Sequence, residues 1–533
     1  MLRLFPITLL ASALQLAQGL AVSGPAPNVV DLGYVKYRGN LSFPDTVAYL
    51  GIPYAEPPLG DRRFRNPLPL NLGRITREAR GKVVDASVYP DFCVQGTTGG
   101  GDAGGAGSED CLKVNVYAPA GAKRGDNLPV LVYIHGGGYI FGNPRNWPFD
   151  HWIHQSPNVV IVSVYYRLDS FGFLATPEFN NPTVGDFNTG FQDQTQALKW
   201  VQQHIEAFGG NPRKVTINGQ SAGGGSVELH LVATGQEGLF SGAIAQSPLF
   251  DFYSEHAGCG TGSTVQRVAC LRKASISALA RAQDLTSTSA INGSYKLFHP
   301  ALDGKVITAP PTISLVNGDF VKVPVMVGST SNETGGGGNT VTQAMHSLFP
   351  GLDAQDLAEF EQEYPLSEFT SVSQQIGVVT GESIFRCGRS ALGNAFAAAT
   401  KAFTYRYNQP NPTQQGTAVQ HAAENWMMFL GSNTGFNGTT TFTPMTPTEI
   451  AFAEELIAYW LSFVRSGDPN TFKLKRSPEW TQFNPNAPAL KRMVLQQGPG
   501  TTTDVSGSFI EDEPEVETDR CTFVISKAAK EQN

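Results

Sequence analysis

A serine between small residues is the feature of this sequence best suited to do chemistry. Residues 219–223 read GQSAG, which fits the pattern G-x-S-x-G. In this pattern the serine sits on a sharp turn from a strand to a helix, and the small residues let the backbone fold tightly so that the hydroxyl stands clear of the sheet. A β-branched segment precedes the motif and a helix-like segment (223–235) follows it. We therefore predict that Ser221 is a nucleophile, rather than part of a flexible Gly-Ser connection.

A serine hydroxyl is a poor nucleophile at neutral pH, so the site also needs a base and donors for a developing oxyanion. Residues 133–142 read YIHGGGYIFG, in which consecutive glycines follow an apolar run. Such glycines allow backbone N–H groups to point at one spot. Alone, the segment would equally fit a plain glycine-rich turn. Upstream of a nucleophile turn, it is typical of an oxyanion hole.

The base is selected by chain order, which for this kind of turn is serine, then acid, then histidine. The histidines beyond the nucleophile and its helix are His256, His299, His346 and His421. Glu333 follows the apolar run 323–329, at the strand end where loops carry catalytic groups, so we expect it to be the acid. His346 lies soon after it in an apparent helix and fits a surface residue. His421 follows a long connection and is the predicted base.

The segments around these residues alternate between strand-like and helix-like patterns. Continuous apolar runs at 128–137, 158–168 and 214–220 predict buried strands, and helical spacing over 191–208 separates the last two. Further expected elements are strands at 242–247, 323–329 and 402–408, and a long helix at 446–467. This order predicts an α/β fold with a large, mostly parallel central sheet flanked by helices.

Composition and charge exclude several other classes of protein. With 41% hydrophobic residues, 16% charged residues and 57 glycines, the 533-residue chain fits a loop-rich globular enzyme better than a coiled coil or a disordered chain. The net charge is −8 and no long basic run occurs, so neither nucleic acid nor an anionic membrane surface is an expected partner. No repeat or linker divides the chain, and residues 20–533 are expected to form a single domain.

The first residues have the layout of a secretory signal peptide. Arg3 precedes an apolar run, and small residues follow, so residues 1–19 are predicted to be removed after Gly19. No later segment is long and apolar enough to span a bilayer, so no transmembrane anchor is expected. We expect a protein that is secreted or retained in the lumen of the secretory pathway. The sequons, which are compatible with glycosylation there, are at Asn40, Asn292, Asn332 and Asn437.

The six cysteines suit an oxidising compartment. They are Cys93, Cys111, Cys259, Cys270, Cys387 and Cys521. An even number supports disulfides but permits many pairings. Proximity in the chain favours 93–111 and 259–270, which leaves 387 and 521 as a long-range pair.

Several ordered stretches carry a resemblance to a known family over nearly the whole mature chain. They include GIPYAEPPLGDRRF (51–64), SEDCLKVNVY (108–117), HGGGY (135–139), the segment 191–224, GSTSNETG (328–335) and HAAENWMMF (421–429). The sequence resembles the type-B carboxylesterase/lipase family of α/β-hydrolases, which includes cholinesterases, fungal lipases and sterol esterases.

The resemblance implies a site and a mechanism. It implies a catalytic triad of Ser221, Glu333 and His421, and an oxyanion hole formed by the N–H groups of Gly137, Gly138 and Ala222. It also implies the disulfides 93–111, 259–270 and 387–521. The reaction would be acyl transfer from a small-molecule ester without metal or cofactor.

Departures from the family narrow the expected substrate. The loop between Cys93 and Cys111 is short and consists mostly of Gly, Thr and Ala, so it cannot form the amphipathic lid of fungal lipases. It also lacks the tryptophan with which cholinesterases bind a quaternary ammonium. We expect small to medium esters. The alternatives are a lipase or sterol esterase covered by another loop and, less favoured, an inactive cholinesterase-like adhesion protein.

Overall fold

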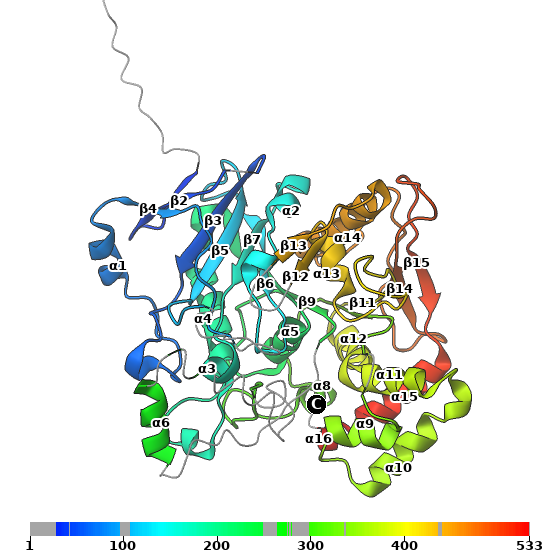
Figure 1. The fold of residues 1–533 in the computed structure, drawn as a ribbon. Helices are drawn as coiled ribbons and strands as arrows, with labels where there is room; N and C mark the ends of the chain where they lie inside the picture. The colour runs from blue at the N-terminus through cyan, green and yellow to red at the C-terminus, as the bar shows by residue number, and fades with distance from the viewer. Residues whose placement is uncertain are drawn as a thin grey trace, which may run out of the picture.

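A central sheet organises the chain. The computed structural model describes residues 28–531 except residue 42 and the segments 96–106, 249–263, 274–275, 277–278, 280–297, 335–336 and 435–439. Among the described residues, one ten-stranded sheet has the order β15-β14-β11-β10-β9-β8-β6-β7-β5-β3 (Figure 1). Neighbouring strands from β14 to β7 run parallel, and β15, β5 and β3 at the two edges are antiparallel to their neighbours. The predicted large, mostly parallel sheet is confirmed.

The strands of this sheet are β3 (Thr46–Pro53), β5 (Lys113–Pro119), β6 (Leu128–Ile134), β7 (Val160–Val164), β8 (Gly210–Gln220), β9 (Gly242–Gln246), β10 (Val325–Thr330), β11 (Ala402–Tyr407), β14 (Lys491–Leu495) and β15 (Phe509–Asp512). A second sheet joins β1 (Val29–Asp31), β2 (Lys36–Gly39) and β4 (Val83–Ala86), and a third joins β12 (Ser432–Thr434) to β13 (Thr440–Phe442). Each strand predicted from the sequence is present within a few residues of its expected position.

The α-helices are α1 (Leu72–Ala79), α2 (Asp150–Gln155), α3 (Asp169–Phe173), α4 (Thr189–His204), α5 (Ala222–Val232), α6 (Thr264–Lys273), α8 (Pro311–Asn317), α9 (Val341–Leu348), α10 (Ala354–Glu363), α11 (Val372–Gly381), α12 (Cys387–Ala399), α13 (Ala423–Met428), α14 (Pro447–Ser466), α15 (Glu515–Ser526) and α16 (Ala528–Glu531). In Figure 1, α9, α10, α11, α15 and α16 gather at the lower right, beside the C-terminus. The predicted helices at 191–208 and 446–467 correspond to α4 and α14.

Helices cover both faces of the sheet because alternate residues of a strand point to opposite sides. On β6, Val130 and Val132 belong to the core beneath α4, α5, α8 and α12. Leu131 and Tyr133 belong to a second core, which α2, α13 and α14 cover. All five residues of β7 are likewise buried. A strand covered on both sides is almost entirely apolar, which is why these runs could be recognised in the sequence.

Two of the predicted disulfides are confirmed. The Cα atoms of Cys93 and Cys111 lie 5.1 Å apart, and those of Cys387 and Cys521 lie 4.9 Å apart, with a sulfur–sulfur bond in each pair. Cys270 is exposed and forms no disulfide with any residue in the described part of the chain. Its predicted partner, Cys259, lies outside the described residues, so that pairing stays a prediction.

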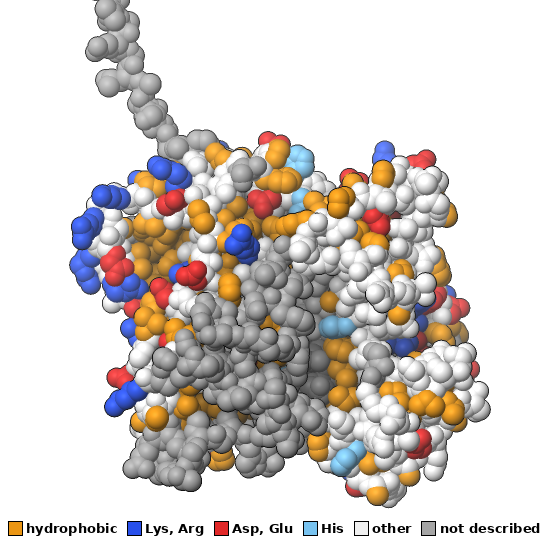
Figure 2. Space-filling view, viewed as in Figure 1, with side chains coloured by type: hydrophobic (Ala, Val, Ile, Leu, Met, Phe, Trp, Pro, Cys, Tyr) orange, Lys and Arg blue, Asp and Glu red, His pale blue; other side chains and the backbone are white. Residues whose placement is uncertain are grey.

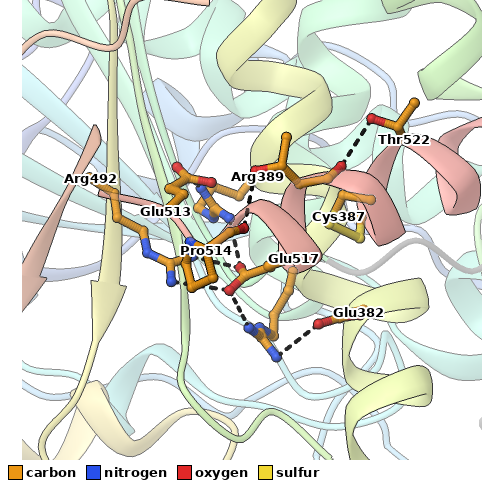
Figure 3. Close-up of a disulfide and its surroundings, with 11 residues drawn as sticks. Glu382, Cys387, Arg389, Arg492, Glu513, Pro514, Glu517 and Thr522 are labelled. Carbon is orange, nitrogen blue, oxygen red and sulfur yellow. Dashed lines mark hydrogen bonds and ion pairs between the residues drawn. A yellow bond between two sulfur atoms is a disulfide. The ribbon is translucent and has the colours of Figure 1, made fainter. Parts of the chain in front are cut away.

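The second disulfide adjoins a buried cluster of charges that fixes α15 against α12 and β14 (Figure 3). The Glu517 carboxylate of α15 forms ion pairs with Arg389 of α12 at 3.0 Å, with Arg492 of β14 at 2.6 Å and with Arg386 at 2.8 Å. Burial opposes ionisation of Glu517, but the arginines outweigh it and hold the pKa of this carboxyl well below its usual range. Arg389 also pairs with Glu513 at 2.5 Å. Segments far apart in the sequence are thus joined by charge as well as by sulfur.

Several predictions about export fall largely on residues outside the description. The predicted signal peptide lies within residues 1–27, and the sequons at Asn292 and Asn437 are also among the residues left undescribed. Asn40 is described, and its side-chain amide donates to the Ser87 carbonyl at 3.0 Å. Within the described residues, no helix combines the length and the apolar character that crossing a membrane requires.

The cluster predicts a large loss of stability when its central carboxylate is removed. Glu517→Gln leaves three arginines without their shared charge partner, two of which have side chains no more than 3% exposed. We expect the free energy of unfolding to fall by about 3–5 kcal/mol in urea titrations. Glu78→Gln is the control, because Glu78 pairs with Arg74 on the surface and its loss should cost less than about 1 kcal/mol. Equal, small losses in both variants would contradict the structural role of the cluster.

Candidate active site

The predicted nucleophile lies on a turn between β8 and α5. β8 ends at Gln220 and α5 begins at Ala222, so Ser221 is the single residue between them. Its backbone has φ 58° and ψ −125°, a strained conformation for a residue with a side chain. A Cβ at Gly219 would lie 2.2 Å from the Gly223 carbonyl oxygen, and one at Gly223 would lie 2.0 Å from that of Ile134. Only glycines fit on either side of this turn.

The structure brings Ser221, His421 and Glu333 together although they are far apart in the sequence. Ser221 Oγ lies 2.8 Å from His421 Nε2, and His421 Nδ1 lies 2.5 Å from Glu333 Oε2. Glu333 follows β10, and His421 lies in the loop before α13. His346, the other histidine considered, is exposed on α9. The spacing suits proton transfer from the serine hydroxyl to the imidazole, with the carboxylate holding the ring.

The carboxylate of Glu333 is itself fixed by neighbours. Its side chain is fully buried. Its Oε1 accepts the hydroxyl of Ser247 at 2.7 Å and the backbone N–H of Thr330 at 2.5 Å. These two donors leave Oε2 directed at His421. An acceptor-only carboxylate in this position fixes the imidazole proton on Nδ1, which frees Nε2 to accept the serine hydroxyl.

Two buried acids favour the charged imidazole. Burial lowers the pKa of His421, but the charge and hydrogen bond of Glu333, together with the charge of Glu424, outweigh it and raise this pKa above its usual value. Burial raises the pKa of Glu424 itself to about 7, and the charge of Glu333 adds to this effect. Glu424 was not predicted from the sequence. Its only signal was an acid three residues after the predicted base, at the start of a short helix.

The predicted oxyanion donors lie in segments next to the serine. Gly137 and Gly138 line the cavity beside Ser221, and both have positive φ, 112° and 59°. A Cβ at Gly137 would lie 2.0 Å from the Phe141 carbonyl oxygen, so this tight turn requires glycine. Ala222 is the first residue of α5, where a backbone N–H has no partner within the helix. In the described chain, no acceptor contacts the N–H of these three residues.

His135 of the HGGG motif supports the turn and is buried. Its ring stacks on Tyr166 with centroids 4.5 Å apart and on Trp147 at 5.8 Å. Burial lowers its pKa to about 4, so it remains neutral near pH 7. A neutral ring suits packing, and it makes His135 a structural residue of this segment.

A cavity of about 390 Å³ opens above the serine. Figure 2 shows this face of the molecule hollowed near its centre, with hydrophobic side chains and a histidine along the wall. Its apolar lining is Phe141, Trp147, Ile384, Phe385 and Trp426. Its polar lining includes Asn411, Gln414, Asn425, Ser432 and Asn433. The described lining contains no Asp, Glu, Lys or Arg, which favours an uncharged ligand.

Gln220 is buried beside the nucleophile and the base. Its side chain is 2% exposed, and its Nε2 lies 3.4 Å from His421 Nε2. Its Oε1 accepts the amide of Asn425 at 3.1 Å. The residue beside the serine therefore contacts the predicted base directly, with a neutral amide.

Two other sequence-based arguments fall on residues outside the description. The loop that was judged too short to be a lid lies mostly within 96–106. The sequence also offers aromatic residues in 246–253 as candidates for an acyl pocket, and these residues lie within the undescribed segment 249–263. Both stay predictions. Among the described residues, no cluster of His, Cys, Asp and Glu could hold a metal ion.

Comparisons with known proteins agree with this geometry. Residues 28–504 match the model of the Carboxylesterase family. The chain is similar to acetylcholinesterase of Electrophorus electricus (35% identity, over 62% of this chain and 54% of that enzyme). It is also similar to acylcarnitine hydrolase of Mus musculus (29% identity, over 81% of this chain and 80% of that enzyme). Among solved structures, Aspergillus niger EstA is 28% identical with a TM-score of 0.79, and the match covers 95% of this chain and 99% of that one.

The contact between Gln220 and His421 predicts a shift in pH dependence. Gln220→Glu places an anion beside the imidazole, which favours its charged form and raises its pKa. Since a base must be uncharged to accept a proton, activity should be lost at a higher pH on the acid side. We expect the acid limb of kcat/KM for a neutral p-nitrophenyl ester to move up by about one pH unit. An unmoved limb would mean that Gln220 is only a spacer in the turn.

Proposed function

The chain belongs to the Carboxylesterase family, and we propose that it is a secreted serine esterase that hydrolyses small to medium carboxylic esters through an acyl-enzyme intermediate. The observation that carries this proposal is the hydrogen-bonded series of Ser221, His421 and Glu333 at the base of the cavity. A nucleophile, its base and an orienting acid occur here with the spacing that acyl transfer needs.

In the acylation step, Ser221 Oγ attacks the ester carbonyl while His421 Nε2 takes the serine proton. Glu333 holds the ring and stabilises the resulting imidazolium. The carbonyl oxygen becomes an oxyanion, to which the N–H groups of Gly137, Gly138 and Ala222 donate hydrogen bonds. When the tetrahedral intermediate collapses, His421 gives its proton to the departing alcohol, and the acyl group remains on Ser221.

Deacylation reverses these roles with water in place of the alcohol. His421 takes a proton from water as the water oxygen attacks the acyl carbon. The same three N–H groups donate hydrogen bonds to the second oxyanion. Collapse returns the proton to Ser221 Oγ and releases the carboxylic acid. Every proton is accepted and returned by His421, so these steps use only the residues described.

The cavity supports a neutral ester of limited size. The described lining carries no charged carboxylate that would attract a quaternary ammonium, and position 220 beside the serine is an amide. The short, glycine-rich loop between Cys93 and Cys111 argues against an amphipathic lid for a lipid interface. The name acetylcholinesterase of one relative suggests choline esters. The absence of a carboxylate from the described lining and the amide at position 220 favour uncharged esters instead.

Export is part of the same proposal. The two disulfides suit an oxidising compartment, and the N-terminal pattern of residues 1–19 is that of a cleaved signal peptide. Glycosylation is proposed at Asn40, Asn292 and Asn437. These assignments concern where the enzyme acts and leave its chemistry unchanged.

Removing the nucleophile tests the reaction. Ser221→Ala should lower kcat/KM for p-nitrophenyl esters by roughly a thousandfold or more, with the fold retained by circular dichroism. Ser241→Ala is the matched control, because Ser241 is exposed and its hydroxyl only donates to the Val215 carbonyl. Activity that survives in Ser221→Ala would contradict the assigned role.

Chain length tests the substrate class. We expect kcat/KM to be highest for soluble short and medium acyl esters and to fall for long chains, with no jump in rate above the solubility limit. A series of p-nitrophenyl esters, with triglyceride emulsions as the comparison, measures both properties. Faster hydrolysis of long-chain emulsions than of short soluble esters would favour a lipase or sterol esterase.

A further inference from the structure

A pair of amides connects the wall of the cavity to the imidazole of His421. Asn425 Nδ2 donates to Gln220 Oε1 at 3.1 Å, and the other end of the Gln220 amide, Nε2, lies 3.4 Å from His421 Nε2. Asn425 is 9% exposed and Gln220 is 2% exposed. Neither amide can therefore exchange its partner freely for bulk water, so the direction of one fixes the direction of the other.

The proton on His421 determines which face of an amide suits it. His421 Nδ1 lies 2.5 Å from Glu333 Oε2, a carboxylate that only accepts, so Nδ1 carries the proton of the neutral ring. The lone pair on Nε2 then accepts the Ser221 hydroxyl at 2.8 Å. The Gln220 N–H group faces the same lone pair at longer range, which suits the neutral imidazole.

The charged imidazole would need the opposite arrangement. Once Nε2 carries a proton, it faces the N–H group of Gln220, and two donors oppose each other. Turning the Gln220 amide would present Oε1 to the ring, but it would also place its NH₂ group against Nδ2 of Asn425. Unless Asn425 turns as well, this bond is lost, so Asn425 opposes a turn of the Gln220 amide alone.

We propose that Asn425 is a positioning residue, which orients the Gln220 amide so that its N–H group faces the lone pair of His421 Nε2. The inference rests on the proposed esterase function and adds to it a residue that acts on the base through a neighbour. Asn425 thereby favours the neutral base in the resting enzyme, in opposition to the acids around the ring.

The other groups facing His421 set the balance that this amide opposes. Glu333, after β10, and Glu424, on α13, both favour the charged ring, whereas burial favours the neutral ring. From the segment 382–386, Phe385 contributes an uncharged aromatic ring, 4.4 Å from the imidazole between centroids. At the end of β8, the described residues that bond the ring are Gln220 and, directly after it, Ser221 through its hydroxyl. Asn425 can therefore influence the charge state of His421 through the amide of Gln220.

The test is the pH dependence of kcat/KM for a p-nitrophenyl ester in Asn425→Leu. Leucine is similar in size and cannot donate, so the Gln220 amide becomes free to turn Oε1 toward the charged ring. We expect the acid limb to move to higher pH by about half a unit. Asn425→Asp, which is isosteric and only accepts, should move the limb further in the same direction, and it carries the test if the leucine variant does not fold.

Two comparisons separate positioning from a structural effect. In a Gln220→Leu background no amide faces the ring, so adding Asn425→Leu should leave the acid limb of that background in place. Asn433→Leu also alters a cavity asparagine. Within the described part of the chain, Asn433 bonds Asn411 and Thr413 and makes no hydrogen bond to Gln220, so the acid limb of this variant should match that of the wild type. A uniform loss of kcat/KM at every pH, or an equal shift without Gln220, would overturn the proposal. Failure of the wild-type protein to hydrolyse any ester would instead reject the proposed function.

Discussion

The arrangement of the site depends on one backbone constraint, the turn that places Ser221 between β8 and α5. The turn leaves no space for side chains at Gly219 and Gly223, and Ser221 itself has positive φ. The surrounding sheet holds this strain, because Ser221 N–H donates to the Gln246 carbonyl at the end of the neighbouring strand β9. Because the serine is fixed at the carboxyl end of the central strand β8, the loops that follow β6 and β10 and the loop before α13 can meet it.

A second theme is the balance of charge around the base. Glu333 and Glu424 favour imidazolium, which is the form that the ring takes in both tetrahedral intermediates of the proposed mechanism. An enzyme also needs a neutral ring to begin the reaction. The neutral amide of Gln220, oriented by Asn425, favours this neutral ring without adding another buried charge. The acids thus favour the charged ring, whereas the amide favours the neutral ring.

Much of this could be predicted from the sequence, because the signals were local or ordered. Strands such as β6 and β7 are almost entirely apolar, since helices cover both faces, and the order of serine, acid and histidine selected Glu333 and His421. Strands β3 and β5 at one end of the sheet, and β14 and β15 at the other, were not predicted. Polar residues interrupt the apolar pattern of β5, β14 and β15, which therefore resemble buried parallel strands less closely. Ser247 and Asn425 were also missed. Their contacts with Glu333 and Gln220 depend on which strands and loops become neighbours, and neither residue type is unusual at its position.

The most direct test of the central claim is covalent labelling with an organophosphate, followed by intact-mass measurement and peptide mapping. The account predicts one adduct per chain, on Ser221, with esterase activity lost in proportion to labelling and with much slower labelling in His421→Ala. Full esterase activity after complete modification of Ser221, or an adduct on another residue that accounts for the loss, would contradict it.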